Sequence, residues 1–149
     1  MRDNTEALNR ILQLALFLSE DSAKDLATYG LTQSRTRVLW ELAQQGPMHQ
    51  RALADVIGVS ARNITGLVDA LVATGFVTRE PHPTDRRAAL VTLTAHGTRT
   101  TDDLRRRHRE LADALFSDMP AERYDRFVED LVEVISRLER LEAATRQPS

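Results

Sequence analysis

A pair of short helical patterns separated by a tight turn constrains the fold of this chain more than any other feature. The first pattern covers Gln50–Ile57, and its apolar residues recur at the i, i+3 and i+4 spacing of one helix face: Leu53, Val56 and Ile57. Gly58 follows at once and can adopt the left-handed conformation that ends a helix. Ser60 then stands where a second helix needs an N-cap oxygen. Two helices joined this closely predict a helix-turn-helix.

The second helix is predicted to begin at Ala61, and its side chains separate by kind. One stripe is apolar and is expected to be buried: Ile64, Leu67, Val68, Leu71 and Val72. The opposite stripe is small or polar: Arg62, Thr65, Gly66 and Asp69. A helix that enters the major groove needs this division, because one side anchors it while the other meets base edges. We therefore expect DNA contacts from Ser60, Arg62, Asn63, Thr65 and Gly66. An ordinary surface helical hairpin is the alternative.

A predicted β-hairpin follows these helices. Residues 76–80 and 88–93 are rich in strand-forming side chains, and we expect the segment 81–85 not to continue the ladder because its two prolines remove donors. The hairpin tip carries three charged residues that we expect to serve DNA binding: Asp85, Arg86 and Arg87. The carboxylate would orient one arginine, and one or both guanidinium groups would enter a minor groove. A solvated tip with a local ion pair is the alternative.

The segment from Gly75 to Gly97, GFVTREPHPTDRRAALVTLTAHG, resembles the signature of the multiple antibiotic resistance regulator (MarR) family. That signature joins a Gly-hydrophobic-Val strand to a proline-containing wing with Asp-Arg-Arg, a second strand and Leu-Thr-x-x-Gly. Residues 60–71 match the recognition helix of the family in character, and the specific part of the resemblance covers residues 50–97. The resemblance implies a mainly α fold with a small β-wing (α+β). This fold is a winged helix-turn-helix with long N- and C-terminal dimerisation helices.

Two further helices are predicted before the helix-turn-helix. Residues 5–28 predict a long helix with an apolar surface broader than one stripe: Leu8, Ile11, Leu12, Ala15, Leu16 and Leu18. Residues 32–45 predict a helix capped by Thr32, with three apolar residues facing inward: Val38, Leu39 and Leu42. Gly46-Pro47 ends this helix, and Met48-His49 is expected to form an edge strand against the wing.

Two helices are predicted after the wing. Thr94 is the expected N-cap of a helix that runs to about Ser117, with five basic residues that we interpret as a solvated face rather than a DNA contact: Arg99, Arg105, Arg106, Arg107 and Arg109. Pro120 is expected in the first turn of the last helix, whose apolar residues form a seam: Phe127, Leu131, Val134, Ile135, Leu138 and Leu141. Too little chain remains to cover both terminal helices, and in the resembling family these helices interlock between two subunits. The tail after Ala144 is expected to be disordered.

The expected organisation is a single domain over residues 1–149. Residues 32–94 would form the DNA-binding lobe, and residues 5–29 and 95–144 the dimerisation helices. The formal net charge is −2, but residues 50–109 hold ten arginines and six acidic residues, a net +4, while the remainder carries −6. Only local charge matters for phosphate contact, so this division is compatible with DNA binding.

Several classes of function find no support in the sequence. The chain has no cysteine, and its four histidines lack metal-ligand spacing, so no disulfide, thiol chemistry, cofactor or metal is expected. The sequence contains no phosphate-cradling glycine loop, nucleophile elbow or His-Glu-x-x-His, so we predict no enzyme. No stretch approaches the roughly 20 apolar residues of a membrane span, and no signal segment begins the chain. A cytoplasmic protein with no membrane partner is expected.

The preferred hypothesis is a homodimeric transcriptional regulator that binds a pseudo-palindromic operator in double-stranded DNA. The resemblance implies a repressor that a small phenolic or lipophilic effector releases, with Tyr29, Trp40 and His49 as candidate lining residues. For Trp40, a plain core position is the alternative. Two other hypotheses remain: a winged-helix dimer that acts as a protein-protein interaction module, and a DNA binder that senses no ligand.

Overall fold

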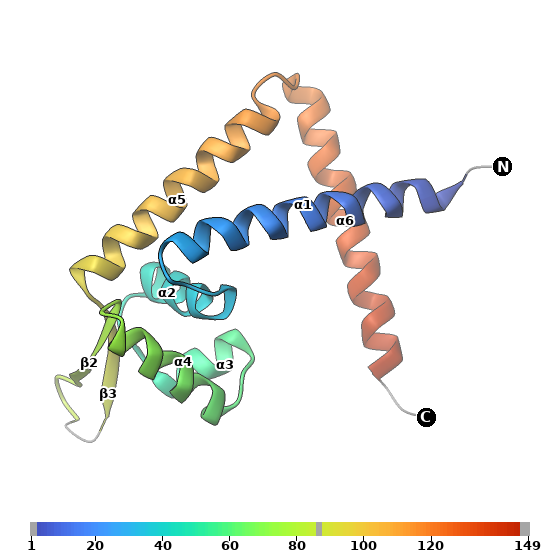
Figure 1. Cartoon of the computed structure of the whole chain (residues 1–149). Coiled ribbons are helices and arrows are strands. Elements are labelled where there is room, and N and C mark those ends of the chain that lie inside the picture. Colours follow the sequence, from blue (N-terminus) through green and yellow to red (C-terminus); the bar gives the residue numbers. More distant parts are fainter. Residues whose placement is uncertain (1–2, 86–87, 147–149) are drawn as a thin grey trace. The chain divides into compact units, whose positions relative to one another are not determined.

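The computed structural model describes residues 3–85 and 88–146, which form helices and a small sheet (Figure 1). The elements in chain order are α1 (Asn4–Thr28), α2 (Gln33–Gln45), β1 (Met48–His49), α3 (Gln50–Ile57), α4 (Ala61–Ala73), β2 (Val77–Pro81), β3 (Ala89–Leu93), α5 (Ala95–Phe116) and α6 (Ala121–Arg146). The predicted mainly α winged helix-turn-helix is confirmed. The chain divides into two compact units, residues 1–104 and 105–149, and α5 crosses the boundary between them.

The core of the first unit lies where α2, α3, α4 and the sheet meet. Its largest fully buried side chains come from each of these elements: Leu39, Leu53, Ile64, Leu71, Val38, Val68, Val77 and Val91. Burial of each such side chain stabilises the fold by about 1.5–3 kcal/mol relative to exposure. The lobe that carries the predicted DNA-contacting residues is therefore a rigid platform built on one apolar cluster.

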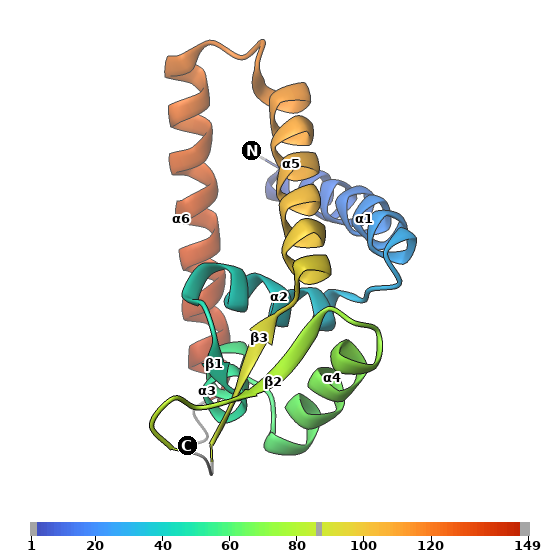
Figure 2. The same cartoon turned by 90° about the vertical axis from the view of Figure 1, so that its left-hand side faces the viewer.

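The sheet is antiparallel, with strand order β1-β3-β2 (Figure 2). Met48 pairs with Val91 at one edge of β3, and Val77 pairs with Leu93 at the other. The predicted edge strand at 48–49 is thus confirmed. The hairpin formed by β2 and β3 is the wing, and its root is buried through Phe76 and Val77.

Local capping signals place the helix starts where the sequence predicts them. The Thr32 hydroxyl accepts a hydrogen bond from the Arg35 N–H at 3.3 Å, and the Ser60 hydroxyl accepts one from the Asn63 N–H at 3.1 Å. Gly58 ends α3 in the left-handed conformation with φ 77°, which a residue without Cβ adopts at little cost. The tight turn between α3 and α4 is therefore specified by residues within the turn itself.

The junction between the wing and α5 is closely packed. The Thr94 hydroxyl donates to the Gly75 carbonyl at 2.6 Å and accepts from the Gly97 N–H at 3.0 Å, which confirms Thr94 as the N-cap of α5. A Cβ at Gly97 would lie 2.1 Å from the Phe76 carbonyl oxygen. This contact fixes the root of β2 against the first turn of α5.

The predicted burial of Val72 is wrong, and Val56, on the predicted apolar face of α3, is also exposed. Val56 is 54% exposed and Val72 is 38% exposed, although the helical spacing places both beside buried neighbours. Periodicity identifies the face of a helix but not how far the neighbouring elements extend around it. In α3 and α4, the covered sector stops short of these two side chains.

Three element boundaries also differ from the prediction. Pro81 is the last residue of β2 and pairs with Ala89, and the His82 N–H donates to the Ala88 carbonyl at 3.0 Å, so the wing pairing extends further than expected. Pro at the end of a strand is tolerated because no ladder donor is required there. Pro120 precedes α6 and its carbonyl accepts from the Tyr124 N–H at 2.9 Å, so it lies just before the first turn. Helix α6 continues to Arg146, two residues beyond the expected disorder boundary at Ala144.

Helix α1 is exposed over most of its length within the first unit. Leu26 near its C-terminus is buried, whereas the apolar side chains of the preceding turns are at least 38% exposed: Leu8, Ile11, Leu12, Leu14, Leu16, Phe17 and Leu18. In the second unit, α6 has no buried residue, and its large exposed side chains are Tyr124, Val128, Val132, Val134, Ile135, Leu138 and Leu141. The aromatic ring of Phe116 contacts the rings of Tyr124 and Phe127 and joins α5 to α6.

No single helix within residues 3–85 and 88–146 is long and apolar enough to cross a membrane. Helices α3 and α4 reach the required length and hydropathy only as a pair bent by 112°, and their apolar residues belong to the core described above.

Candidate nucleic-acid interface

The exposed face of α4 carries the residues that the sequence predicts to contact DNA. Arg62, Asn63, Thr65 and Gly66 are all exposed, while Ile64 on the opposite side is buried. In the views of Figures 1 and 2, α4 lies next to the β2–β3 hairpin. A helix with one buried and one polar exposed face, set beside a wing, has the geometry that places side chains on base edges in a major groove.

Two residues that are predicted to contact DNA, Ser60 and Thr65, have hydroxyl groups that already form hydrogen bonds within the protein. The Ser60 hydroxyl caps α4, and the Thr65 hydroxyl donates to the Ala61 carbonyl at 2.9 Å. The Thr65 oxygen also accepts a hydrogen bond from the Gln50 amide nitrogen at 2.8 Å. Each hydroxyl has one donor hydrogen, so Thr65 can offer a base only its remaining acceptor capacity.

A chain of polar contacts links α3, α4 and β2 on this exposed surface. The Gln50 amide that donates to Thr65 accepts, through its oxygen, a hydrogen bond from Arg79 Nη2 at 3.1 Å. The same nitrogen of Arg79 donates to Asp69 Oδ1 at 2.6 Å, forming an ion pair. The chain therefore begins and ends on α4, at Thr65 and Asp69, which lie one helical turn apart.

The sequence patterns did not predict a role for Gln50 or Arg79 at this surface. Gln50 is the first residue of its helix, and Arg79 stands beside Glu80 in a strand. Neither position has a motif that marks it. Their partners lie 10 to 29 residues away in sequence, so only the packing of the lobe brings them together. The small-or-polar stripe of α4, which included Asp69, was the one available signal.

A hydrogen bond from α2 supports the turn between α3 and α4. Arg37 in α2 donates through Nη2 to the Ile57 carbonyl at 3.0 Å, at the C-terminal end of α3. A cationic donor at this end satisfies a carbonyl that the helix leaves unpaired and interacts favourably with the helix dipole. Arg37 thus supports the position of the turn that leads into α4.

Residues 82–85 at the start of the wing loop are held together by a histidine ring. His82 Nδ1 accepts from the backbone N–H groups of Thr84 and Asp85 at 3.1 and 3.2 Å. The His82 ring also stacks on His49 at 5.3 Å between centroids, which ties the loop to the N-terminus of α3. Asp85 is exposed beside this loop. Arg86 and Arg87 lie outside the described residues, so their predicted minor-groove role stays a prediction.

The three residues predicted to line a ligand site occupy different environments. Tyr29 and Trp40 are half-buried and pack against the hydrophobic core. His49 is exposed and contacts the wing through His82. Tyr29 and Trp40 thus both contact the hydrophobic core, whereas His49 has a partner in the wing loop.

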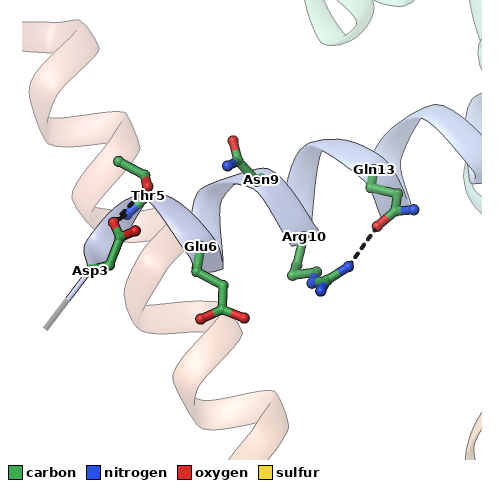
Figure 3. Close-up of a pocket in the computed structure, with 6 residues that line it drawn as sticks. All are labelled: Asp3, Thr5, Glu6, Asn9, Arg10 and Gln13. Atoms are coloured by element: carbon green, nitrogen blue, oxygen red, sulfur yellow. Dashed lines mark hydrogen bonds between the residues drawn. The ribbon is translucent and has the colours of Figure 1, made fainter.

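A polar depression on α1 contains none of these three residues. Figure 3 shows the six side chains that line it: Asp3, Thr5, Glu6, Asn9, Arg10 and Gln13. Hydrogen bonds from the Thr5 hydroxyl and backbone N–H lower the pKa of Asp3 from its usual value. These bonds are those of a helix N-cap, so they account for Asp3 without a ligand. Within residues 3–85 and 88–146, no three His, Asp or Glu side chains are grouped to hold a metal ion.

Comparison with known proteins agrees with this geometry. Residues 31–89 match the family model described as MarR family. The chain is 30% identical over 111 residues to the HTH-type transcriptional repressor YetL of Bacillus subtilis, a match that covers 73% of this chain and 66% of that protein. The match thus spans slightly less than two thirds of the relative's length.

Two solved structures share the fold. The structure of RV1404 from Mycobacterium tuberculosis is 27% identical, with a TM-score of 0.77 and coverage of 91% of this chain and 94% of that one. The structure of reduced AbfR bound to DNA is 21% identical, with a TM-score of 0.55 and coverage of 90% and 92%. The matched family region contains α2, α3, α4 and β2, which together carry the polar face and the contacts described above. The chain belongs to the MarR family of DNA-binding transcriptional regulators, whose members are not enzymes.

Proposed function

We propose that this protein is a homodimeric repressor that binds a pseudo-palindromic operator through α4 and the wing. The observation that carries the proposal is the exposed polar face of α4, supported from beneath by buried Ile64 and Val68. Arg62 and Asn63 stand in the first turn of this helix, where the N-terminal residues of a recognition helix reach base edges. The repressor assignment follows the similar protein YetL, which is described as a transcriptional repressor.

The exposed apolar surfaces of α1 and α6 support the dimer. Helix α6 has no buried residue, and Leu138 and Leu141 are 57% and 67% exposed. Large apolar side chains that are exposed in such numbers along one helix favour burial against a partner surface. A second copy of the chain satisfies this need and provides two recognition helices for two half-sites.

Arg86 and Arg87 are proposed to place the wing in a minor groove, with Asp85 orienting one of them. Support comes from the sequence and from the paired strands that carry the tip. The negative potential of a minor groove attracts guanidinium groups, and this contact would add affinity without reading every base. The protein would bind its operator in the cytoplasm, where that DNA would lie.

We also propose that a small effector molecule releases the protein from its operator. A phenolic or lipophilic molecule would bind near Tyr29, Trp40 and His49 and favour a spacing of the two lobes that mismatches successive grooves. Support comes from the half-buried aromatic rings of Tyr29 and Trp40 at the edge of the core. Such a ligand shifts the population only by its differential affinity for the two states.

The decisive experiment is selection of duplexes from a random-sequence DNA library by the purified protein, followed by titration of the best duplex at two salt concentrations. Recovery of a pseudo-palindrome, with affinity that falls as salt rises, is the expected result. Failure of a folded dimer to enrich any sequence would reject the proposal in favour of a winged-helix protein-protein interaction module. Enrichment without release by any phenolic or lipophilic compound would favour a DNA binder that senses no ligand.

A further inference from the structure

Arg79 connects the wing to both helices of the helix-turn-helix. Its Nη2 donates to Gln50 at the start of α3 and to Asp69 in α4, at 3.1 and 2.6 Å. Gln50 in turn donates to Thr65, one turn before Asp69 on the same helix face. The two ends of the Gln50 amide are thereby assigned different partners, with nitrogen toward the hydroxyl and oxygen toward the guanidinium. One arginine thus closes a ring of contacts over the exposed face of α4.

The charge at this position matters more for a polyanionic partner than for the fold. The side chains of Arg79 and Asp69 are 34% and 60% exposed, and ion pairs with that much solvent contact contribute little to stability. Asp69, however, lies on the same α4 stripe as Arg62 and Thr65, which is the stripe proposed to face DNA. An unpaired carboxylate there would repel phosphates, whereas the ion pair neutralises it.

The geometry also gives Arg79 a mechanical role. The root of β2 is held by buried Phe76 and by the Thr94 hydroxyl, which donates to the Gly75 carbonyl. Arg79 provides a second attachment, at the middle of the five-residue strand, opposite Val91 in β3. Pairing with β3 orients β2 within the sheet, and the contact of Arg79 with Asp69 adds a direct link from the middle of the strand to α4. The contact with Asp69 therefore fixes where the middle of β2 lies relative to α4.

We propose that Arg79 is a positioning residue that neutralises Asp69 and locks the wing and the recognition helix into one rigid DNA-binding surface. This role rests on the DNA binding proposed above. Gln50 is the second member of the lock, because it transmits the position of Arg79 to the Thr65 hydroxyl. Neither residue needs to touch DNA for the effect.

The test uses full-length variants and the duplex that the wild-type protein selects. Arg79→Ala is expected to weaken binding by on the order of fivefold or more, since one unit charge near a phosphate is uncovered. Asp69→Asn added to Arg79→Ala should recover the part of this loss that is due to charge. Arg79→Lys keeps the charge but lacks the planar guanidinium, so it should recover part of the affinity. Melting temperatures of all variants should stay close to the wild-type value.

Two footprinting reagents separate positioning from charge. Hydroxyl radicals attack the sugars from the minor groove, and dimethyl sulfate methylates guanine N7 in the major groove. In Arg79→Ala, protection from hydroxyl radicals by the wing should become weaker and broader, while protection from dimethyl sulfate persists. The Arg79→Ala/Asp69→Asn double variant should recover affinity but not the sharp wing footprint. A general loss of folded structure would instead weaken both footprints together and lower the melting temperature.

A matched control is Arg146→Ala, which removes one exposed arginine that pairs with Glu142 at the far end of α6. If wild type binds and Arg79→Ala behaves like this control, the role of Arg79 is rejected while the proposed function stands. A loss of affinity that follows a lower melting temperature would also reject it. If the wild-type protein binds no duplex, the proposed function itself fails, and the role of Arg79 in DNA binding fails with it.

Discussion

Single residues on α4 differ in how much of their hydrogen-bonding capacity the protein uses. Ser60 caps the helix, and Thr65 both donates to Ala61 and accepts from Gln50. These contacts stabilise the helix and its surroundings, so substitution at either position changes folding and binding together. Arg62 and Asn63, exposed in the first turn, are therefore the better probes of base recognition.

Arg62→Ala and Asn63→Ala are each expected to change the preferred DNA sequence, at a cost of about 1–3 kcal/mol at the contacted base pair. The measurement is repeated selection from the same library with each variant, followed by titration of single-base-pair changes. Gln44→Ala, at an exposed position of α2, is the control and should leave the preference unchanged. Identical selected sequences for wild type and both variants would show that another face of α4 meets the DNA.

Replacement of glycine by alanine is expected to have opposite effects on stability at Gly97 and at Gly66. Gly97→Ala places a Cβ 2.1 Å from the Phe76 carbonyl oxygen, and overpacking of this kind costs about 1–3 kcal/mol or more. Gly66 has no atom within 4 Å of the added Cβ, and Gly→Ala inside a helix stabilises by about 0.5–1 kcal/mol. Urea unfolding of the two variants measures both changes. A smaller free energy of unfolding for Gly66→Ala would contradict the open surface.

Gly66→Ala also tests close approach of DNA to α4. The variant is expected to bind the selected duplex more weakly although it is at least as stable as wild type, because the added methyl group lies on the exposed face. Titration of the duplex, with unfolding data for the same preparation, checks this. Unchanged affinity would place the DNA further from this turn of the helix.

The wing is the element whose function depends on its connection to the rest of the lobe. Its strands pair over five positions, its root is buried, and its loop is held by the His82 ring. The described part of the hairpin is therefore held by the lobe without the side chains of Arg86 and Arg87. Removal of either side chain should leave the fold intact.

Arg86→Ala or Arg87→Ala is expected to weaken DNA binding without dissociating or unfolding the dimer. Loss of one phosphate or groove contact should also reduce the salt dependence of binding by about one counterion. Titration over a range of salt concentrations gives both quantities. Arg126→Ala on exposed α6 removes the same charge away from the lobe and serves as the control. Wild-type affinity in both wing variants would remove the wing from the mechanism.

At the scale of the whole molecule, the terminal helices carry most of the large apolar side chains that are exposed. The apolar side chains of α1 and α6 remain largely exposed, whereas most of those of the lobe are buried. The hydrophobic effect therefore favours association through these helices. Assembly would also set the spacing of the two α4 helices, which couples the dimer to DNA recognition.

Leu138→Glu is expected to dissociate the dimer while leaving the lobe folded, because it places a charge in the middle of the exposed apolar surface of α6. Analytical ultracentrifugation measures the mass, and circular dichroism the helix content. Glu139→Gln, one residue further on the same helix and also exposed, is the matched control and should remain dimeric. A dimer that persists in Leu138→Glu would show that α6 is not in the interface.

The sequence by itself determined the features that depend on neighbouring residues. The caps at Thr32, Ser60 and Thr94 and the left-handed Gly58 are short-range signals, since each forms its contact within a few residues. These signals fixed the order and most of the boundaries of the helices. The polar stripe of α4 was predictable for the same reason, because helical periodicity alone places those residues on one face.

Only the tertiary structure decided features that depend on residues far apart in the chain. Val56 and Val72 are exposed because, among the described residues, the neighbouring elements cover only part of α3 and α4, and periodicity cannot indicate how much. The Arg79 contacts span 10 and 29 residues and require α3, α4 and β2 to be packed together first. Local sequence specifies each element, but the distance between two side chains on different elements is set by the shared core that holds those elements in place.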